Sequence, residues 1–502
     1  MVPLSNRALL PALLGVLLFT PACSSEADSA GGGSLSSGGQ GNAANGGAAA
    51  NGGAAAGGAS ASGGASGSGG ASGGVAGQAA GGAGAGGVPA GGSHSGGAAT
   101  GGSGGDPSYE CPPLPSTCAG AQPTTKEHRI AEADGCEFAL VPWSSSKQAS
   151  RSQLIDALGK LSGGSRKLSD VLGDLNRTAT AGITANNADR LKNHAWRGFR
   201  WNSGDMGVDY WYPQGITGSS DAQAGGTVAG RQALLISWYH NSDDRPTKGV
   251  RVSLADVTNV AAVKYRHLLL VEPTGTTSAP NFKAVATGSG GALHAGGIVW
   301  YGDYLYVADT SGGLRVFDTS RVMLVPDTDN SDQIGVSAGR FDALGYRYAI
   351  PELTRYQLPK DSCSVRFSFV GLDRSSSPPA LITGEYHASD VDGRLVMWDL
   401  DAATHELDVR QGEVRGSAAY VSGQSRMQGA LRNKGNFYMS CSSQAQSFGR
   451  LYRTRPGLAT SSITAWVYGA EDLYLDRGAN IIWTAAEHLN NRDVVGIPLL
   501  AP

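Results

Sequence analysis

The C-terminal three hundred or so residues of this chain repeat one pattern of short apolar runs. The stretch HAGGIVWYGDYLYVADTSGGLRVFDTS, residues 294–320, holds three runs rich in Val, Ile and aromatic residues, separated by Gly, Asp and Ser. Such runs predict short antiparallel strands joined by tight turns. Similar groups of runs recur in five segments: Tyr212–Pro273, His294–Leu353, Phe367–Val409, Arg426–Tyr468 and Ala470–Leu500. A unit of this size cannot bury its apolar face alone, so the units must pack on one another.

Repeated four-stranded units predict an all-β fold of the β-propeller class, most simply with five blades. The last segment contains only three strand-like runs, so a strand from the N-terminal side should complete it. CEFALVPW, Cys136–Trp143, has strand character, and we expect it to close the ring. A short helical insertion is expected before the first blade, within residues 150–190. There, apolar residues recur at helical spacing on both sides of Gly163-Gly164.

The N-terminal region has a different composition. Much of the glycine excess, 75 residues in 502, lies between Gly31 and Gly105, among Ser and Ala. A stretch with almost no large apolar side chains cannot offset its chain entropy by burial, which predicts a disordered linker. The predicted division is therefore a signal peptide at residues 1–22, a linker at 23–106 and a propeller domain at 107–502.

The first residues predict export. Arg7 precedes an apolar segment, residues 8–19, that is too short to span a bilayer as a permanent helix. Thr20-Pro21-Ala22-Cys23 resembles the lipobox of bacterial lipoprotein signals, although Leu is commonest where Thr20 stands. This resemblance implies an extracytoplasmic lipoprotein, held at the outer membrane or cell surface by acyl chains on Cys23. The alternative is ordinary secretion without a lipid on Cys23.

Cysteine usage agrees with an oxidising compartment. Cys111, Cys118 and Cys136 lie close together where the folded part begins, so we expect a local disulfide among them, and a Cys363–Cys441 disulfide is a further possibility. The spacings contain no CxxC pair, so no metal site and no cofactor are predicted, while a structural calcium ion is left open. With 39 basic and 42 acidic residues, the chain lacks the basic footprint of a nucleic-acid-binding protein.

Candidate site residues follow from the repeat. Ligands of propellers usually bind where the innermost strands open, so equivalent positions of those strands were aligned on one small residue in each unit: Gly215, Gly297, Gly371, Gly429 and Asp472. Because strand side chains alternate, the alignment places a polar rim at the mouth of the ring. Its members are Tyr212, Gln214, His294, Arg426, Gln428 and Glu471. The alternative is a hydrated channel whose polar groups only satisfy one another.

A second group of polar residues follows the second strand of several units: His240, Glu385, His387, Glu487 and His488. A His beside a carboxylate can act as a general base or a cation ligand, but it can equally form loop hydrogen bonds. The aromatic residues Trp201, Trp211, Tyr212, Trp238 and Trp300 would suit stacking on sugar rings, or would fill the space between blades.

The stretches HAWRGFRWNSGD, YWYPQGIT, LISWYHN, HAGGIVWYGDYLYVADTSGGLRVFD and GEYHAS together resemble a group of uncharacterised secreted β-propeller proteins of soil bacteria. The resemblance covers the chain from about residue 195 to the end. It implies the architecture and carries over no catalytic residue.

Two classes of function fit these observations. The first is a lipid-anchored binding or scaffold module for an extracellular glycan or a surface protein. The second is an enzyme acting on polysaccharide: a lyase using Tyr212, His294 and Arg426, or a hydrolase using paired carboxylates among Glu385, Glu471 and Glu487. The folded part contains no HExxH or P-loop motif, which favours binding only slightly.

Overall fold

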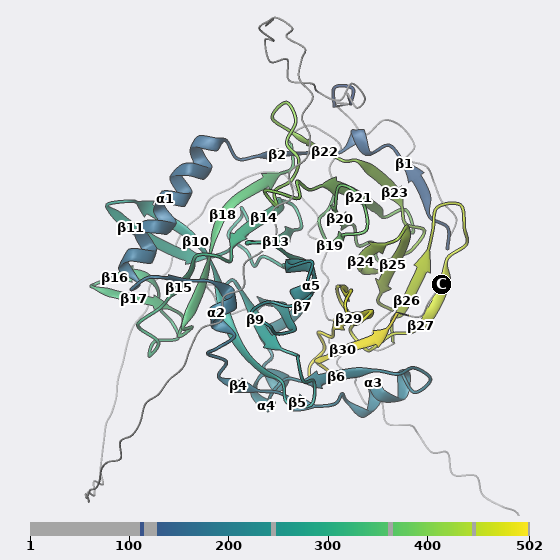
Figure 1. The fold of residues 1–502 in the computed structure, drawn as a ribbon, viewed down its shortest axis with the longest axis horizontal. Helices are drawn as coiled ribbons and strands as arrows, with labels where there is room; N and C mark the ends of the chain where they lie inside the picture. The colour runs from purple at the N-terminus through teal and green to yellow at the C-terminus, as the bar shows by residue number, and fades with distance from the viewer. Residues whose placement is uncertain (1–110, 115–127, 242–246, 360–364, 444–447, 500–502) are drawn as a thin grey trace, which may run out of the picture. The chain divides into compact units, whose positions relative to one another are not determined.

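The computed structural model describes residues 111–114, 128–241, 247–359, 365–443 and 448–499. Within these ranges the strands include five four-stranded antiparallel units, built mainly from the five repeat segments (Figure 1). The predicted all-β propeller class is therefore confirmed. None of the helices in the described ranges has the length and apolar character needed to cross a membrane.

Units 1 and 2 belong to one larger sheet. The strands of unit 1, from the innermost outward, are β7 (Trp211–Gly218), β8 (Ala233–His240), β9 (Val250–Asp256) and β10 (Lys264–Thr276). Those of unit 2 are β12 (Ile298–Tyr301), β13 (Tyr304–Asp309), β14 (Gly313–Asp318) and β18 (Tyr348–Gln357). The outermost strands, β10 and β18, pair in parallel and join the two units.

Units 3 and 4 follow in sequence order. Unit 3 consists of β19 (Phe369–Asp373), β20 (Ala380–Gly384), β21 (Arg394–Asp399) and β23 (Ala418–Val421). Unit 4 consists of β24 (Met427–Asn433), β25 (Asn436–Cys441), β26 (Arg450–Thr454) and β27 (Ser461–Ala465). The predicted repeat segment of unit 3 ends at Val409, but the fourth strand of the unit lies beyond it. Leu407 forms only an isolated bridge with Leu400, and the chain turns before β23 takes that place.

Unit 5 is built from both ends of the folded part. Its strands are β28 (Tyr474–Asp476), β29 (Ile481–Ala485), β30 (Asp493–Pro498) and β6 (Arg197–Arg200), with β5 (Thr180–Ala181) outside them. Closure by an N-terminal strand occurs as expected, but the prediction that Cys136–Trp143 supplies it is wrong. The strand in that segment, β2 (Ala139–Pro142), pairs instead with β18 and with the short β22 (Val414–Arg415).

The closing strand is fixed by backbone and side-chain contacts. Gly198 of β6 pairs with Val495 of β30, and a Cβ at Gly198 would lie 2.5 Å from Val494 O, so a larger residue would push the strands apart. Beside this pair, Asp493 Oδ2 accepts hydrogen bonds from Thr184 N (3.0 Å), Thr184 Oγ1 (2.7 Å) and Asn187 Nδ2 (2.6 Å). These contacts tie the start of α3 (Ala185–Arg190) to unit 5.

The remaining elements cover the edges of the units. Helix α1 (Ser145–Leu161) ends at a Gly-containing turn, and α2 (Leu168–Val171) follows it, as the helical spacing predicted. Leu158 of α1 packs on apolar residues of β10, β18 and the neighbouring β15. The other short elements are η1 (Gly135–Glu137), α4 (Ser203–Gly207), α5 (Ser219–Ala222), β1 (Ala131–Ala133), β3 (Ser165–Arg166), β4 (Arg177–Thr178), β11 (Ala279–Ala284), β15 (Val322–Leu324), β16 (Ile334–Ser337) and β17 (Arg340–Ala343).

Apolar side chains fill the space between neighbouring units. Trp238 of unit 1 belongs to the same buried cluster as Tyr474 and Trp483 of unit 5, and Val299 of unit 2 packs with Val370 of unit 3. Burial of large aromatic and branched side chains in this way is what stabilises a stack of sheets. The units therefore depend on one another for their cores.

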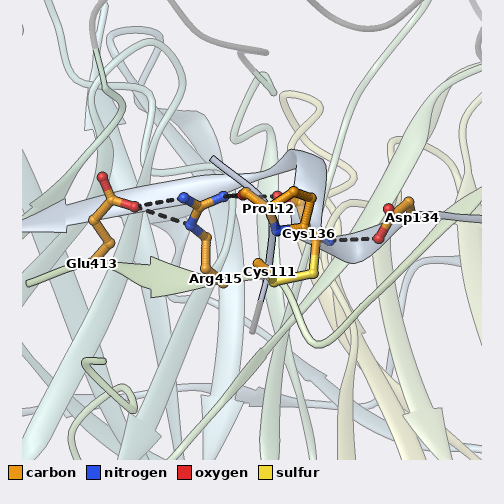
Figure 2. The surroundings of a disulfide bond; sticks show 6 residues. All are labelled: Cys111, Pro112, Asp134, Cys136, Glu413 and Arg415. Carbon is orange, nitrogen blue, oxygen red and sulfur yellow. Dashed lines mark hydrogen bonds and ion pairs between the residues drawn. A yellow bond between two sulfur atoms is a disulfide. The ribbon is translucent and has the colours of Figure 1, made fainter. Parts of the chain in front are cut away.

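One disulfide fastens the chain where it joins the domain. Cys111 and Cys136 are bonded, as expected for a local pair, and Cys118 lies outside the described residues (Figure 2). Arg415 lies next to this disulfide, where it donates to Cys136 O (3.0 Å) and pairs with Glu413 (2.9 Å). A Cys363–Cys441 disulfide is not formed: Cys441 is a buried free thiol, and Cys363 lies outside the described residues.

Candidate functional site

The innermost strands meet backbone to backbone at the aligned small residues. A Cβ at Gly215 would lie 2.7 Å from Ile298 N, and one at Gly429 would lie 2.5 Å from Asp472 Cα. A Cβ at Gly297 would overlap Val370 N of the next unit. Neighbouring inner strands can approach this closely because glycine has no side chain. At the aligned small residues, backbone fills the space between neighbouring inner strands. The predicted polar rim residues lie at the ends of these strands.

Asp472 occupies the corresponding position of unit 5. Its side chain is fully buried, and Oδ2 accepts hydrogen bonds from Ile216 N (3.2 Å) and Ile298 N (3.3 Å) of units 1 and 2. Burial holds the pKa of the Asp472 carboxyl well above its usual range. The carboxyl links units 1, 2 and 5 around the axis.

Two glutamates of unit 5 flank this residue. Glu471 N donates to Ala485 O (3.0 Å), and Glu487 N donates to Gly469 O (2.8 Å), on either side of the bridge between Ala470 and Ala486. Glu471 and Glu487 thus occupy diagonal positions on adjacent strands. In a regular antiparallel pair such positions are about 7–8 Å apart.

Each glutamate is held by a glutamine from a flanking unit. Gln214 of β7 donates from Nε2 to Glu487 Oε2 (2.9 Å), and Gln428 of β24 donates from Nε2 to Glu471 Oε1 (3.3 Å). Gln214 and Glu471 are almost completely buried, whereas one fifth of the Glu487 side chain is exposed. Four of the predicted rim and second-strand residues therefore form two contacts across unit boundaries.

Glu487 differs from an ordinary surface glutamate in its protonation. Burial raises its pKa to about 7, against the opposing effects of the Gln214 hydrogen bond and the charge of Arg492. Arg492 is itself buried and donates from Nε to the backbone oxygen of Glu487 (2.9 Å). A carboxyl that is half protonated at neutral pH can deliver a proton to a bound molecule.

Two aromatic residues and one histidine lie around Glu487. His488 Nδ1 is 3.6 Å from Glu487 Oε1, and the His488 ring lies 4.3 Å from that of Tyr468. Burial lowers the pKa of His488, so its imidazole is neutral at pH 7. The pKa of the Tyr212 phenol is raised mainly by burial and also by the nearby carboxylates of Asp209 and Glu487, and its hydroxyl donates to Asp209 O (2.6 Å). Both aromatic rings are partly exposed.

The predicted residues of unit 3 form a separate group. Glu385 is buried and accepts hydrogen bonds from Arg394 Nε (2.7 Å) and Arg394 Nη2 (2.8 Å), while His387 Nε2 lies 3.6 Å from Glu385 Oε2. Hydrogen bonds and nearby positive charge lower the pKa of Glu385 to about 2, against the effect of its burial. A carboxylate so fully neutralised is a poor proton donor. Glu385 is therefore a structural anion.

Two other predicted histidines are packed against aromatic rings. His294 lies 4.5 Å from the ring of Tyr239, and burial lowers its pKa to about 4. His240 is buried between Tyr210 and Trp211, at 5.6 and 5.2 Å. Neither histidine contacts Glu471 or Glu487 through an identified hydrogen bond or ion pair in the described residues.

Most of the aromatic residues considered for sugar stacking fill space between units. Trp201, Trp211, Trp238 and Trp300 are all less than 5 % exposed and belong to buried apolar clusters. Of that set, only Tyr212 keeps part of its ring accessible. The sequence cannot distinguish these cases, because both roles require a large ring beside a strand.

One buried polar network in unit 1 was not predicted. Trp238 Nε1 donates to Ser253 Oγ (2.7 Å), Ser253 contacts His267 Nδ1 (2.8 Å), and His267 Nε2 contacts Asp205 Oδ2 (3.0 Å). Burial lowers the pKa of His267 to about 3, so the ring is neutral and carries its proton on the side of Asp205. All four side chains are buried, so no substrate reaches the serine. The network ties α4 to three strands, and its members are too far apart in sequence to form a local motif.

Comparisons with known proteins found distant likenesses among solved structures. No family model and no curated protein matches the chain. A gluconolactonase from Xanthomonas campestris is 12% identical, with 64% of this chain and 97% of that chain covered and a TM-score of 0.28. A glycoside hydrolase is 9% identical, covering 67% and 95%, with a TM-score of 0.31. A GH43_1 enzyme from Xanthomonas citri complexed with xylotriose is 8% identical, covering 63% and 94%, with a TM-score of 0.28. At this distance, the fold assignment depends on the strand pairing of this chain itself.

Proposed function

We propose that the protein hydrolyses glycosidic bonds of an extracellular polysaccharide, with Glu487 as general acid and Glu471 as the second carboxylate. The observation that carries this proposal is the pair of glutamates on unit 5, each held by a glutamine of a flanking unit. One member of the pair, Glu487, keeps its proton near neutral pH.

Glycoside hydrolysis uses two carboxyl groups about 5–9.5 Å apart, one protonated and one ionised. The backbones of Glu471 and Glu487 stand at diagonal positions, which are about 7–8 Å apart in a regular antiparallel pair, so both carboxyl groups come from one small area of unit 5. Glu487 would give its proton to the oxygen of the leaving sugar. Glu471, which is almost completely buried in this structure, would have to become accessible in order to attack the anomeric carbon or to activate the water that attacks it. The exposed part of Tyr212 offers an aromatic surface for a sugar ring.

The lyase alternative has less support. A tyrosine that abstracts a proton needs a lowered pKa, whereas burial raises that of Tyr212, and its hydroxyl is already donated to Asp209 O. The glycan-binding alternative predicts affinity without bond cleavage, and it is separated from hydrolysis by experiment.

The test is the release of reducing ends by the full chain from a panel of neutral and acidic polysaccharides. Glu487→Gln should lower kcat by about 10²–10⁴-fold, as loss of a general acid does, while substrate binding is retained. Glu132→Gln, which changes an exposed glutamate of β1, is the matched control and should keep full activity. Binding without any release of reducing ends would refute hydrolysis and support the binding module.

The proposed place of action is outside the cytoplasm. The Cys111–Cys136 disulfide supports an oxidising compartment. The lipobox-like segment and Cys23 lie outside the described residues, so anchoring at the outer membrane or cell surface stays a prediction.

A further inference from the structure

Arg426, two residues before Gln428, has a constrained backbone and, among the described residues, a guanidinium without a hydrogen-bond or ion-pair partner. It precedes β24 with a φ of 58°, a conformation that costs a non-glycine residue energy. Two hydrogen bonds hold it there: Arg426 N donates to His387 O (2.7 Å), and Ser442 N donates to Arg426 O (2.9 Å). Within the described ranges, the partly exposed guanidinium makes no hydrogen bond and no ion pair. The two hydrogen bonds therefore fix the Arg426 backbone, while the five N–H donors of its guanidinium stay available to a bound anion.

His387 provides a second positive group at the same place. One third of its side chain is exposed, and its contact with Glu385 raises its pKa above that of an ordinary histidine. Glu385 also accepts hydrogen bonds from two nitrogens of Arg394. Its negative charge is therefore shared between Arg394 and His387. The charged groups here are Arg366, His387, Arg394 and Arg426 against Glu385, Asp390 and Asp392, which leaves a small excess of positive charge when His387 is protonated.

This positive group lies close to the glutamate pair. Arg426 stands two residues before Gln428, whose amide holds Glu471. Two residues of chain span at most about 7 Å, so Arg426 and Gln428 lie close together although Arg426 precedes the strand. A sugar polymer that places one unit at Glu471 would therefore place a neighbouring unit at Arg426.

We propose that Arg426 and His387 bind the acidic groups of an anionic polysaccharide, which makes an acidic polymer the substrate class of this site. A guanidinium and an imidazolium bind planar or tetrahedral anions well. A neutral sugar would leave both cations without a partner and would therefore bind more weakly. The substrate assignment rests on the proposed hydrolysis, whereas the anion binding does not.

The test measures Kd of the full chain by isothermal titration calorimetry with three polymers. Polygalacturonate carries carboxylates, dextran sulfate carries sulfates, and dextran is neutral. Arg426→Gln should weaken binding of the preferred acidic polymer at least tenfold. Lys434→Gln removes an exposed cation from the turn at the other end of β24, so it is the matched control and should bind like the wild type.

The comparison of the two acidic polymers identifies the anion, since the one that loses more affinity in Arg426→Gln is the one bound. His387→Gln provides a second variant and should weaken the same polymer. Equal affinity for dextran and the acidic polymers, or an unchanged Kd in a folded Arg426→Gln variant, would overturn the proposal. Arg426-dependent binding without hydrolysis would refute only the proposed function. Hydrolysis of a neutral polymer that Arg426→Gln leaves unchanged would refute only the acidic substrate.

Discussion

Replacing Glu487 by Gln should remove a pH dependence from the stability of the fold. The folded-state pKa of this carboxyl is raised from 4.5 to about 7 by burial. Below pH 4.5 the carboxyl is protonated in both the folded and the unfolded chain. The free energy of unfolding is then at its full value with respect to this group. Between pH 4.5 and 7 the unfolded chain loses the proton first, so the free energy of unfolding falls as pH rises.

The size of the effect follows from the shift. A rise from 4.5 to about 7 corresponds to about 3 kcal/mol, and partial exposure of the Glu487 side chain reduces this to about 2–3 kcal/mol. The amide introduced by Glu487→Gln would keep a hydrogen-bonding partner for Gln214 but would not titrate. Relative to this variant, the wild type should therefore lose about 2–3 kcal/mol of stability between about pH 4.5 and 7.5.

Urea unfolding of both proteins at half-unit pH steps measures the difference directly. The other buried groups, Glu385 and His488 among them, titrate in both proteins and cancel to first order in the difference. A difference that stays constant over this range would show that Glu487 has an ordinary pKa. The proposed proton donor would then be lost, whatever the activity of the variant.

Three further changes test other parts of the structure. Gly297→Ala should destabilise the domain by about 1–3 kcal/mol or more in urea unfolding, because its Cβ would overlap the next inner strand, whereas Gly225→Ala, which meets no atom within 4 Å, should be nearly neutral. Cys111→Ser opens a link spanning 25 residues and should cost about 3 kcal/mol, and reductant should destabilise the wild type but not the variant. If Cys23 carries lipid, the wild type should partition into a detergent phase and Cys23→Ala into the aqueous phase; a wild type found wholly in the aqueous phase would contradict acylation.

The repeat was predictable from the sequence because short strands and their turns leave a local pattern. Each unit begins with a run that contains a small residue, and Gly215, Gly297 and Gly429 do lie where neighbouring inner strands touch. The pattern indicates strands but not their partners. For that reason the strand character of Cys136–Trp143 led to the wrong closing strand, because the fit of Arg197–Arg200 depends on contacts with β30 that the sequence does not show.

The site was only partly predictable for the same reason. Aligning the inner strands identified Gln214, Gln428 and Glu471, but nothing local indicates that Gln214 reaches Glu487 across a unit boundary. The pKa of Glu487 depends on burial by several units, and the low pKa of Glu385 depends on Arg394. Protonation is decided by tertiary surroundings, which a single sequence does not display.

The closure of unit 5 has a consequence for the order of events when the chain is made. Thr184 and Asp493, which are hydrogen-bonded, stand 309 residues apart, and both proposed carboxylates lie on the unit that this contact completes. Contacts of such long range form late in folding, because the intervening loop must first be closed. During synthesis from the N-terminus, β6 leaves the ribosome long before β30 can join it. The glutamate pair therefore assembles after almost the whole chain has emerged, and a chain interrupted before β30 would have an incomplete site.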